Sequence, residues 1–336
     1  MATVLVALSI GSSMTTIYKE GEGFALSEPT LVALTNTTAG KEVIAVGLDA
    51  KRYLTKAGEN ITVTSPVNEG IIVEPELAAT MLKEFLAKVC PRRLIKPKIR
   101  ALVTVPVGIT AAEKRNFEKV CYLAGVSECI LIPSVVCAAL GVGKDITSDY
   151  VSLIVSIGGG CTDIALIGQE RIVNGLSIGI GGQNIDKAIE QQILTSYNLI
   201  IDEVTAERLK KEIGSLYIND FNELKISGQD ATSRETREVV VTAMDIYPAV
   251  EHYYNKISES IASLLALSSP EINSDVNKLG ITFVGGDSKM VGIEKYFKTK
   301  LNLGVSCFID AEDVIILGAS KLLDDPTTLK HLLINL

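Results

Sequence analysis

The pattern of apolar and polar positions along the chain switches repeatedly between a strand-like and a helix-like period. Thr3–Ser9 and Thr15–Tyr18 are short apolar runs on either side of a polar turn, which is typical of a hairpin. In Glu74–Cys90 the apolar residues recur every three or four positions, and Pro75 suits the first turn of a helix. This succession predicts an α/β fold in which helices cover mixed sheets.

The same reasoning extends over the rest of the chain. Thr110 and Glu113 form a capping box at the start of a helix. Residues 217–234 are polar and predict irregular structure, whereas Glu235–Leu267 predicts a long helix that Pro248 splits or kinks. The other elements that we expect are strands at Ala101–Val107, Glu128–Ile132, Arg171–Ile178 and Gly280–Val284, and helices at Ser134–Leu140, Thr205–Leu216 and Ile315–Leu323, with one more starting at Asn184.

The stretch Val151–Ile167 predicts a strand, a glycine turn and a second strand. Its first strand is too continuously apolar for a surface strand and fits one that is buried on both faces. Gly158, Gly159 and Gly160 let the backbone approach another molecule, and successive N–H groups in such a turn form a concave anion site. A phosphate is the natural guest, although a tight apolar hairpin without a ligand fits the same residues.

A second copy of this unit lies near the N-terminus. Ser9–Ile17 reads SIGSSMTTI and Ser156–Ile164 reads SIGGGCTDI, and both follow an apolar strand. The chain has 336 residues, a length that favours about two domains, so the repeat predicts duplicated halves. Two such turns facing one another would clamp a polyphosphate between the halves.

Composition and charge exclude several classes of protein. The chain is 47% hydrophobic and 21% charged, which is typical of a globular protein, and its net charge of −8 argues against nucleic-acid binding. No apolar run is long enough for a transmembrane helix, and the first residues lack the charged region of a signal peptide. The six cysteines form no CxxC pair, so we expect free, buried thiols in a reducing cytoplasm and no zinc site.

With these elements in order, the chain resembles the actin–Hsp70–sugar kinase superfamily and, within it, the MreB rod-shape proteins, the bacterial actins. The resemblance covers nearly the whole chain. It is carried by SIGGGCTDIALI and by EGEGFALSEPTLVAL (Glu20–Leu34), AVGLDAKR (Ala45–Arg52), SPVNEGII (Ser65–Ile72), VTVPVGITAAEKR (Val103–Arg115), YNLIIDEVTAERLKKEIGS (Tyr197–Ser215) and GITFVGGDSKMVGIEKYF (Gly280–Phe297).

The resemblance implies an actin-like ATPase fold, in which two duplicated ribonuclease-H-like domains, each with a small subdomain, surround a nucleotide cleft. The corresponding bounds are residues 1–33, 69–146 and 314–336 for the core of domain I, 34–68 for its small subdomain, 147–181 and 246–313 for the core of domain II, and 182–245 for its small subdomain.

The resemblance also implies which residues bind ATP or ADP. The residues at the phosphates are Gly11, Ser12, Ser13 and Met14 in the first turn and Gly158, Gly159 and Gly160 in the second. Those at the nucleoside are Glu207, Arg208, Leu209 and Lys210, and those of the turn on the adenine side are Gly285, Gly286, Asp287 and Ser288. The family usually has a third glycine in place of Asp287.

The chain departs from the family where acidic residues serve hydrolysis. Ser9 and Ser156 stand where the family usually has aspartates that orient the water shell of magnesium, a cation that prefers oxygen ligands. Pro133 and Ser134 stand where it has glutamates, one of which positions the attacking water. Because phosphoryl transfer relies on charge neutralisation and on a positioned nucleophile, we expect weak or lost ATP hydrolysis and weakened magnesium binding. The glycine turns would still bind nucleotide.

Other functions stay open at this point. Asp163 and Glu69 are candidates to replace the missing acids, and the chain would then be an active ATPase of the same fold. An Hsp70-like chaperone or assembly factor is a further alternative, although no peptide-binding domain follows the closing helix. A sugar kinase would need a catalytic aspartate, for which the sequence offers no evident candidate.

The segment Pro91–Arg100 sets Leu94 and Ile95 between basic residues. It is either a solvated linker or a hydrophobic tip with basic flanks that contacts an anionic membrane surface. The resemblance places it where some family members insert apolar residues into the membrane. We therefore expect a cytoplasmic subunit that assembles with itself into filaments, with an active paralogue and the inner face of the cell membrane as candidate partners.

Overall fold

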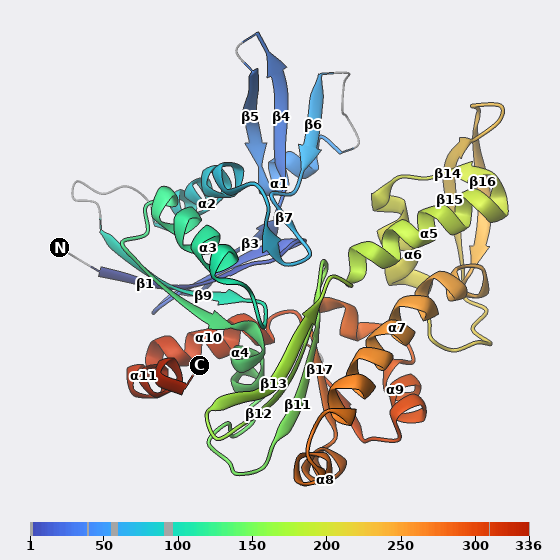
Figure 1. The fold of residues 1–336 in the computed structure, drawn as a ribbon. Coiled ribbons are helices and arrows are strands. Elements are labelled where there is room, and N and C mark those ends of the chain that lie inside the picture. Colours follow the sequence, from blue (N-terminus) through green and yellow to red (C-terminus); the bar gives the residue numbers. More distant parts are fainter. Residues whose placement is uncertain (1–2, 39, 55–59, 91–96, 309, 336) are drawn as a thin grey trace.

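Two five-stranded sheets lie next to one another at the centre of the molecule in the computed structural model, which describes residues 3–38, 40–54, 60–90, 97–308 and 310–335 (Figure 1). The first sheet has the order β10-β9-β1-β2-β3 and the second has the order β13-β12-β11-β17-β18. Their strands are β1 (Thr3–Ile10), β2 (Met14–Lys19), β3 (Gly23–Pro29), β9 (Lys98–Val105), β10 (Glu128–Pro133), β11 (Ser152–Ile157), β12 (Thr162–Gly168), β13 (Arg171–Ile178), β17 (Ile281–Val284) and β18 (Val305–Cys307).

The two sheets have the same build, which confirms the repeat seen in the sequence. In each, the strand before the turn pairs antiparallel with the strand after it, β1 with β2 and β11 with β12. On its other side, that first strand pairs parallel with a strand from later in the chain, β9 in the first sheet and β17 in the second. The turn of each copy therefore lies at the edge where the parallel strands end.

Smaller sheets flank the two large ones. The strands β4 (Val32–Thr37), β5 (Gly40–Val46) and β6 (Ile61–Thr64) form one, and β14 (Leu199–Ile200), β15 (Glu223–Asp230) and β16 (Thr236–Thr242) form another. A hairpin of β7 (Val67–Asn68) and β8 (Ile71–Ile72) leads back to the first large sheet. The domain bounds given above stay a prediction.

Helices cover both large sheets. They are α1 (Gly47–Lys51), α2 (Pro75–Val89), α3 (Ala111–Ala124), α4 (Ser134–Gly141), α5 (Gly182–Tyr197), α6 (Glu203–Ile213), α7 (Ala243–Ala266), α8 (Pro270–Leu279), α9 (Ile293–Leu301), α10 (Val314–Asp324) and α11 (Pro326–Asn335), with a 3-10 turn, η1 (Gly286–Lys289). The capping box of α3 forms as predicted, with Thr110 and Glu113 each bonding the backbone N–H of the other.

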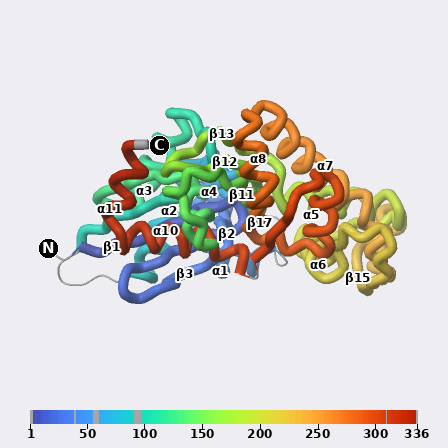
Figure 2. The backbone as a smooth tube through the Cα atoms, turned by 90° about the horizontal axis from the view of Figure 1, so that it is seen from below, coloured from blue at the N-terminus to red at the C-terminus, as the bar shows by residue number. Residues whose placement is uncertain are grey.

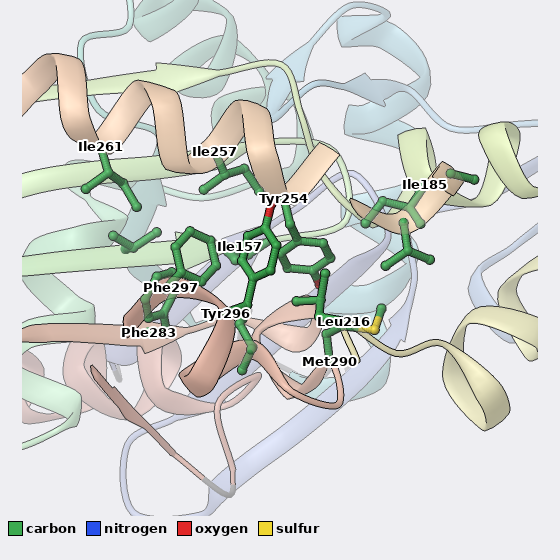
Figure 3. Packing of buried hydrophobic residues seen from close by; sticks show 14 of the residues in the cluster. Ile157, Ile185, Leu216, Tyr254, Ile257, Ile261, Phe283, Met290, Tyr296 and Phe297 are labelled. Atoms are coloured by element: carbon green, nitrogen blue, oxygen red, sulfur yellow. The ribbon is translucent and has the colours of Figure 1, made fainter. Parts of the chain in front are cut away.

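Three apolar cores hold these layers together. One lies between the first sheet and α2 and α3, and another lies between the second sheet and helices α5 to α9. In the latter the rings of Phe283, Phe297 and Tyr254 stack in the interior (Figure 3), and the first two have centroids 4.5 Å apart. The third core contains residues of both sheets together with α4 and α10, so it joins the two halves of the molecule.

The region from residue 217 to 267 corrects two predictions. Residues 223–230, expected to be irregular, form β15, and residues 236–242, expected to be helical, form its partner β16. In β16, Val239 and Val241 turn inward while Glu238 and Val240 are exposed, so the period is that of a strand. The helix α7 starts only at Ala243 and continues past Pro248, which therefore does not split it.

Candidate functional site

The two predicted phosphate turns have the same backbone closure. The Gly11 N–H donates to the carbonyl of Met14 over 3.0 Å, and the Gly158 N–H donates to the carbonyl of Cys161 over 2.9 Å. Each bond spans the same number of residues and links the two strands of its hairpin. The repeat in sequence is thus a repeat in hydrogen bonding as well.

The two turns face one another in direct contact. A Cβ added to Gly159 would overlap the Ser13 side chain, and one added to Gly160 would overlap that of Ser12. Ser12 is buried, and its hydroxyl accepts a hydrogen bond of 2.9 Å from the Gly70 N–H. The structure therefore brings the first and second phosphate sets together, and the glycines are required by this close approach.

Helix α5 fixes the orientation of the second turn. The N–H groups of Gly182 and Gln183, in its first turn, donate to the carbonyls of Gly158 and Gly159 over 3.0 and 2.8 Å. The Gln183 side chain also reaches across to the Ser12 carbonyl, 3.5 Å away. The free N–H groups at the helix start are thereby used to set the peptide planes of the turn.

A buried cluster of three charges links the two predicted nucleoside segments. The Lys210 ammonium lies 3.0 Å from a carboxylate oxygen of Asp186 on α5 and 3.0 Å from one of Asp287 on η1. Lys210 and Asp186 are both almost completely buried. The unusual Asp287 thus has a partner, and Gly182 leaves room for the pair because a Cβ there would overlap both side chains.

Two carboxylates share one ammonium in this cluster, and their pKa values follow from that. Burial raises the pKa of Asp186 to about 7, because the opposing effect of Lys210 is partly cancelled by the negative charges of Asp287 and Glu207. Burial alone would lower the pKa of Lys210, but Asp287 and Asp186 raise it above its usual value. Lys210 is therefore charged at neutral pH.

The four residues expected at the nucleoside have different surroundings in the structure. Leu209 belongs to the apolar core, and Arg208 turns away to donate to the Lys225 carbonyl on β15. Lys210 faces the charge cluster. Partial burial would raise the pKa of Glu207, but Lys211, Lys51 and Lys210 together lower it. Because Lys51 belongs to α1, this interaction connects α6 with a helix from the N-terminal part of the chain.

The predicted adenine-side turn is held from three sides. Gly285 has a φ of 89° and its N–H donates to the Ala311 carbonyl over 2.8 Å. A Cβ on Gly285 would overlap the Ile157 carbonyl, so only glycine fits there. The Ser288 hydroxyl donates to the Gly285 carbonyl, and the buried Tyr254 hydroxyl donates to the Asp287 carbonyl over 2.6 Å. Gly286 lies on the exposed side of the turn.

Two of the three serines for which the resemblance implies acids, Ser156 and Ser134, lie close to Asp163. Ser156 is paired directly with Asp163 across β11 and β12. The Ser134 hydroxyl, in the first turn of α4, donates to Asp163 Oδ2 over 2.6 Å, and Pro133 precedes it at the helix cap. Ser9 lies at the corresponding place in β1, opposite Thr16.

The two carboxylates proposed as replacements differ in their surroundings. Burial raises the pKa of Asp163, opposed by hydrogen bonds from Ser134, Ser177 and the Val107 N–H. Its oxygens are thus engaged by the protein, which argues against a role in polarising water. Glu69 is exposed, with a φ of 49°, and its carboxylate lies against Gly179.

The described part of the chain holds no group of three or more His, Cys, Asp or Glu residues suited to a metal ion. None of the helices in that part combines the length and hydropathy that a membrane span requires. Leu94 and Ile95, the predicted membrane contact, lie outside the described residues. The six cysteines are free, as expected, but only Cys121 and Cys137 are buried, and the other four are partly exposed where buried thiols were predicted.

Sequence reasoning missed several residues of this site. Asp186 is absent from the predicted site, although an acidic residue one helical turn after Gly182 could have indicated that it belongs there. The N–H groups of Gly182, Gln183 and Val107 carry no side-chain signal and could be found only from the structure. The Gln183 side chain, which donates to the Ser12 carbonyl, links α5 to the first turn.

Comparisons with known proteins agree with this geometry. Residues 3–331 match the MreB/Mbl protein family. The cell shape-determining protein MreB of Escherichia coli strain K12 is 31% identical over 322 residues, which cover 95% of this chain and 93% of that protein. The cell shape-determining protein Mbl of Bacillus subtilis strain 168 is 29% identical over 321 residues, with 95% and 96% covered.

Solved structures show the same fold. MreB 5 of Spiroplasma citri bound to AMPPNP has a TM-score of 0.91 at 29% identity, with 100% of both chains covered. A MamK double helical filament has a TM-score of 0.80 at 20% identity, covering 96% of this chain and 99% of that one, and so shares the fold. The architecture is therefore the actin-like ATPase fold, as expected, and the chain belongs to the MreB/Mbl family.

Proposed function

We propose that this chain is a cytoskeletal subunit of the bacterial actin type, which assembles into filaments that help to set cell shape. The observation that carries the proposal is the match to cell shape-determining MreB and Mbl proteins over 95% of the chain, with the actin-like fold complete. A head-to-tail contact between identical subunits extends without closing and so gives a filament. The cytoplasm, or the inner face of the membrane, is the proposed location.

The facing turns support nucleotide binding. Related structures hold AMPPNP and ADP, and this chain offers backbone N–H groups, Ser12 and Ser13 on one side and Gly159 and Gly160 on the other. Such groups suit a phosphate chain. Lys210, Glu207 and the turn at Gly285 would border the nucleoside. A bound nucleotide would supply the phosphate bond whose hydrolysis active members of the fold catalyse.

The hydrolysis itself would be weak or lost. Ser9, Ser156 and Ser134 offer neutral hydroxyls where carboxylates are expected, and Asp163 is engaged by Ser134 and by Val107. A serine cannot neutralise or orient a cation as a carboxylate does, so magnesium would be held less firmly. Filaments would then form with little turnover, alone or together with an active paralogue.

Negative-stain electron microscopy of the purified protein tests assembly, without nucleotide and with Mg-ATP. Filaments in both samples would show assembly free of nucleotide control, and filaments only with Mg-ATP would show that binding gates assembly. The variant Gly159→Ala, which places a Cβ against Ser13, would then lose the response to Mg-ATP. Gly304→Ala is the matched control, because the added Cβ would lie 3.8 Å from its nearest atom, the Cα of Gly280. Absence of filaments at every concentration would contradict the proposal.

Phosphate release tests the second part of the proposal. We expect release at the background level under conditions in which filaments form. Steady release that Gly159→Ala abolishes and Gly304→Ala leaves intact would instead show an active ATPase. The exposed carboxylate of Glu69 would then be the first residue to replace.

The membrane contact is tested separately. We propose that Leu94 and Ile95, with their basic neighbours, bind anionic vesicles when filaments provide many copies of the segment. The double variant Leu94→Ser and Ile95→Ser is expected to lose co-sedimentation with anionic vesicles and to keep assembly. Equal binding by both proteins would remove the membrane from the list of partners.

A further inference from the structure

The two large sheets are joined by one buried carboxylate at the edge where the first sheet's parallel strands end. The Val107 N–H, just beyond β9, donates to Asp163 Oδ1 over 3.1 Å. The Ser134 hydroxyl, just beyond β10, donates to Asp163 Oδ2 over 2.6 Å. Because β9 and β10 are parallel neighbours, their ends lie together and present both donors to the same side chain.

The acceptor belongs to the other half of the molecule. Asp163 is the second residue of β12, in the second sheet, and Ser177 on β13 lies opposite it and also donates to it. Asp163, Ser134 and Val107 are each more than nine-tenths buried, so water does not replace these bonds. A hydrogen bond in such a buried place is electrostatically stronger than one exposed to water.

The residues packed around these hydrogen bonds leave little room for the two halves to move relative to each other. Val107, Val135 and Ile132 of the first half pack in one core with Ala165 and Ile154 of the second. A Cβ on Gly175 of β13 would lie 3.1 Å from a methyl group of Val107, so the second sheet approaches Val107 closely. The helix α4, which carries Ser134, packs against α10 on one side and against strands β11 and β12 on the other (Figure 2).

We propose that Ser134, Asp163 and the Val107 N–H form an interdomain clamp that holds the two halves closed through the chain's own groups, whichever nucleotide is present. Every bond of the clamp has both partners in the chain, so no ligand is needed to bridge the halves. In a subunit of this kind, nucleotide would change the distance between the halves little. The clamp concerns the single subunit, so it stands or falls independently of filament formation.

Hydrogen–deuterium exchange on the soluble subunit tests the clamp, because the Val107 N–H is itself one of its donors. We compare the peptides around Val107 and Ser134 with a peptide from β17, which lies in the core of the second half. Ser134→Ala is expected to speed exchange around Val107 at least tenfold and to leave β17 within twofold. Asp163→Asn, which cannot accept from both donors, should act in the same way.

Two variants separate the clamp from general loss of stability. Ser134→Thr keeps the hydroxyl and should restore slow exchange. Ser320→Ala removes a hydroxyl of similar burial that bonds only within α10, so it should leave exchange at Val107 unchanged. An increase of the same size in all peptides, or none at Val107, would overturn the clamp.

The last part of the experiment measures exchange with Mg-ADP added at millimolar concentration. With the clamp, exchange around Val107 in the wild-type chain stays within twofold of the nucleotide-free value. Slowing by tenfold or more on adding Mg-ADP would mean that the ligand closes the halves, and this would also overturn the proposal.

Discussion

At the scale of single residues, a serine at position 156 suits its electrostatic surroundings. Ser156 and Asp163 are directly opposed on neighbouring antiparallel strands, where Cβ atoms lie about 5 Å apart. A carboxylate at position 156 would face a buried carboxylate that is already engaged by Ser134. The serine at 156 and the clamp at Asp163 are therefore compatible with each other, whereas two acids would repel.

This predicts the effect of restoring an acid. Ser156→Asp should lower the free energy of unfolding by roughly 2 kcal/mol or more at neutral pH, because it buries a second carboxyl group next to Asp163. Ser156→Asn, similar in shape and neutral, is the control and should cost clearly less. Urea denaturation of the two variants makes the comparison. Equal stability of the two variants would show that Asp163 does not disfavour a carboxylate at position 156.

The charge cluster at Asp186 predicts how stability depends on pH. The pKa of Asp186 rises from 3.8 to about 7 on folding, so the folded state holds the proton more tightly. The stability that this pKa shift of Asp186 contributes is fully present below about pH 4 and is lost as the pH rises through 7. The charged groups that surround Asp186 are Lys210, Asp287 and Glu207.

Asp186→Asn removes this titration and keeps the shape of the side chain. The free energy of unfolding of the variant relative to the wild type should therefore increase by about 2.6 kcal/mol between pH 5 and pH 8, at 1.36 kcal/mol per pKa unit. Denaturation curves of both proteins at the two pH values measure it. A constant difference would mean that Asp186 titrates in its ordinary range.

At the scale of elements, the helices α4 and α10 cross so closely that glycines are required. A Cβ on Gly318 of α10 would overlap the Cys137 carbonyl of α4, and one on Gly141 would overlap the Val314 carbonyl. In an exposed helix, replacing glycine by alanine stabilises by up to about 1 kcal/mol. Here the steric overlap should make the replacement of glycine by alanine destabilising.

Gly318→Ala is therefore expected to destabilise the chain by roughly 2–4 kcal/mol, as overpacking between buried elements does. Gly304→Ala, where the nearest atom is 3.8 Å from the added Cβ, should change stability little. Thermal unfolding of the two variants tests this. A stabilised Gly318→Ala would show that α4 and α10 can separate without cost.

Elements with a strongly periodic pattern of apolar residues or with a helix-capping residue could be predicted from the sequence. Elements that are fixed by partners distant in the sequence could not. The helix α3 was foreseen because Thr110 and Glu113 act on their own neighbours. By contrast, β16 is a strand because Val239 and Val241 pack inward and β15 pairs with it, and its charged residues resemble those of a helix. The repeated turns were recognised as one motif, yet Asp163 was read as a catalytic candidate because its donors, at residues 107 and 134, are far away in sequence.

At the scale of the whole molecule, net charge governs how copies of the chain approach one another. Each subunit carries a net charge of −8, so subunits repel at low ionic strength, and salt screens this repulsion over about 10 Å at 0.1 M. If filaments form, their critical concentration should fall severalfold between 50 and 300 mM KCl. Pelleting assays measure it. A rise with salt would show that ion pairs between subunits outweigh the overall repulsion.

The position of α10 has a consequence for how the protein is made. The strands of the first sheet are complete once residue 133 has been synthesised, but the helix that packs on β1, β2, β9 and α4 begins only at Val314. At 5–20 residues per second, translation of the intervening stretch takes roughly 10 to 40 seconds. During that time the nascent chain exposes an apolar sheet face on the ribosome. Chaperones that shield such faces would therefore be needed most before the last helices emerge.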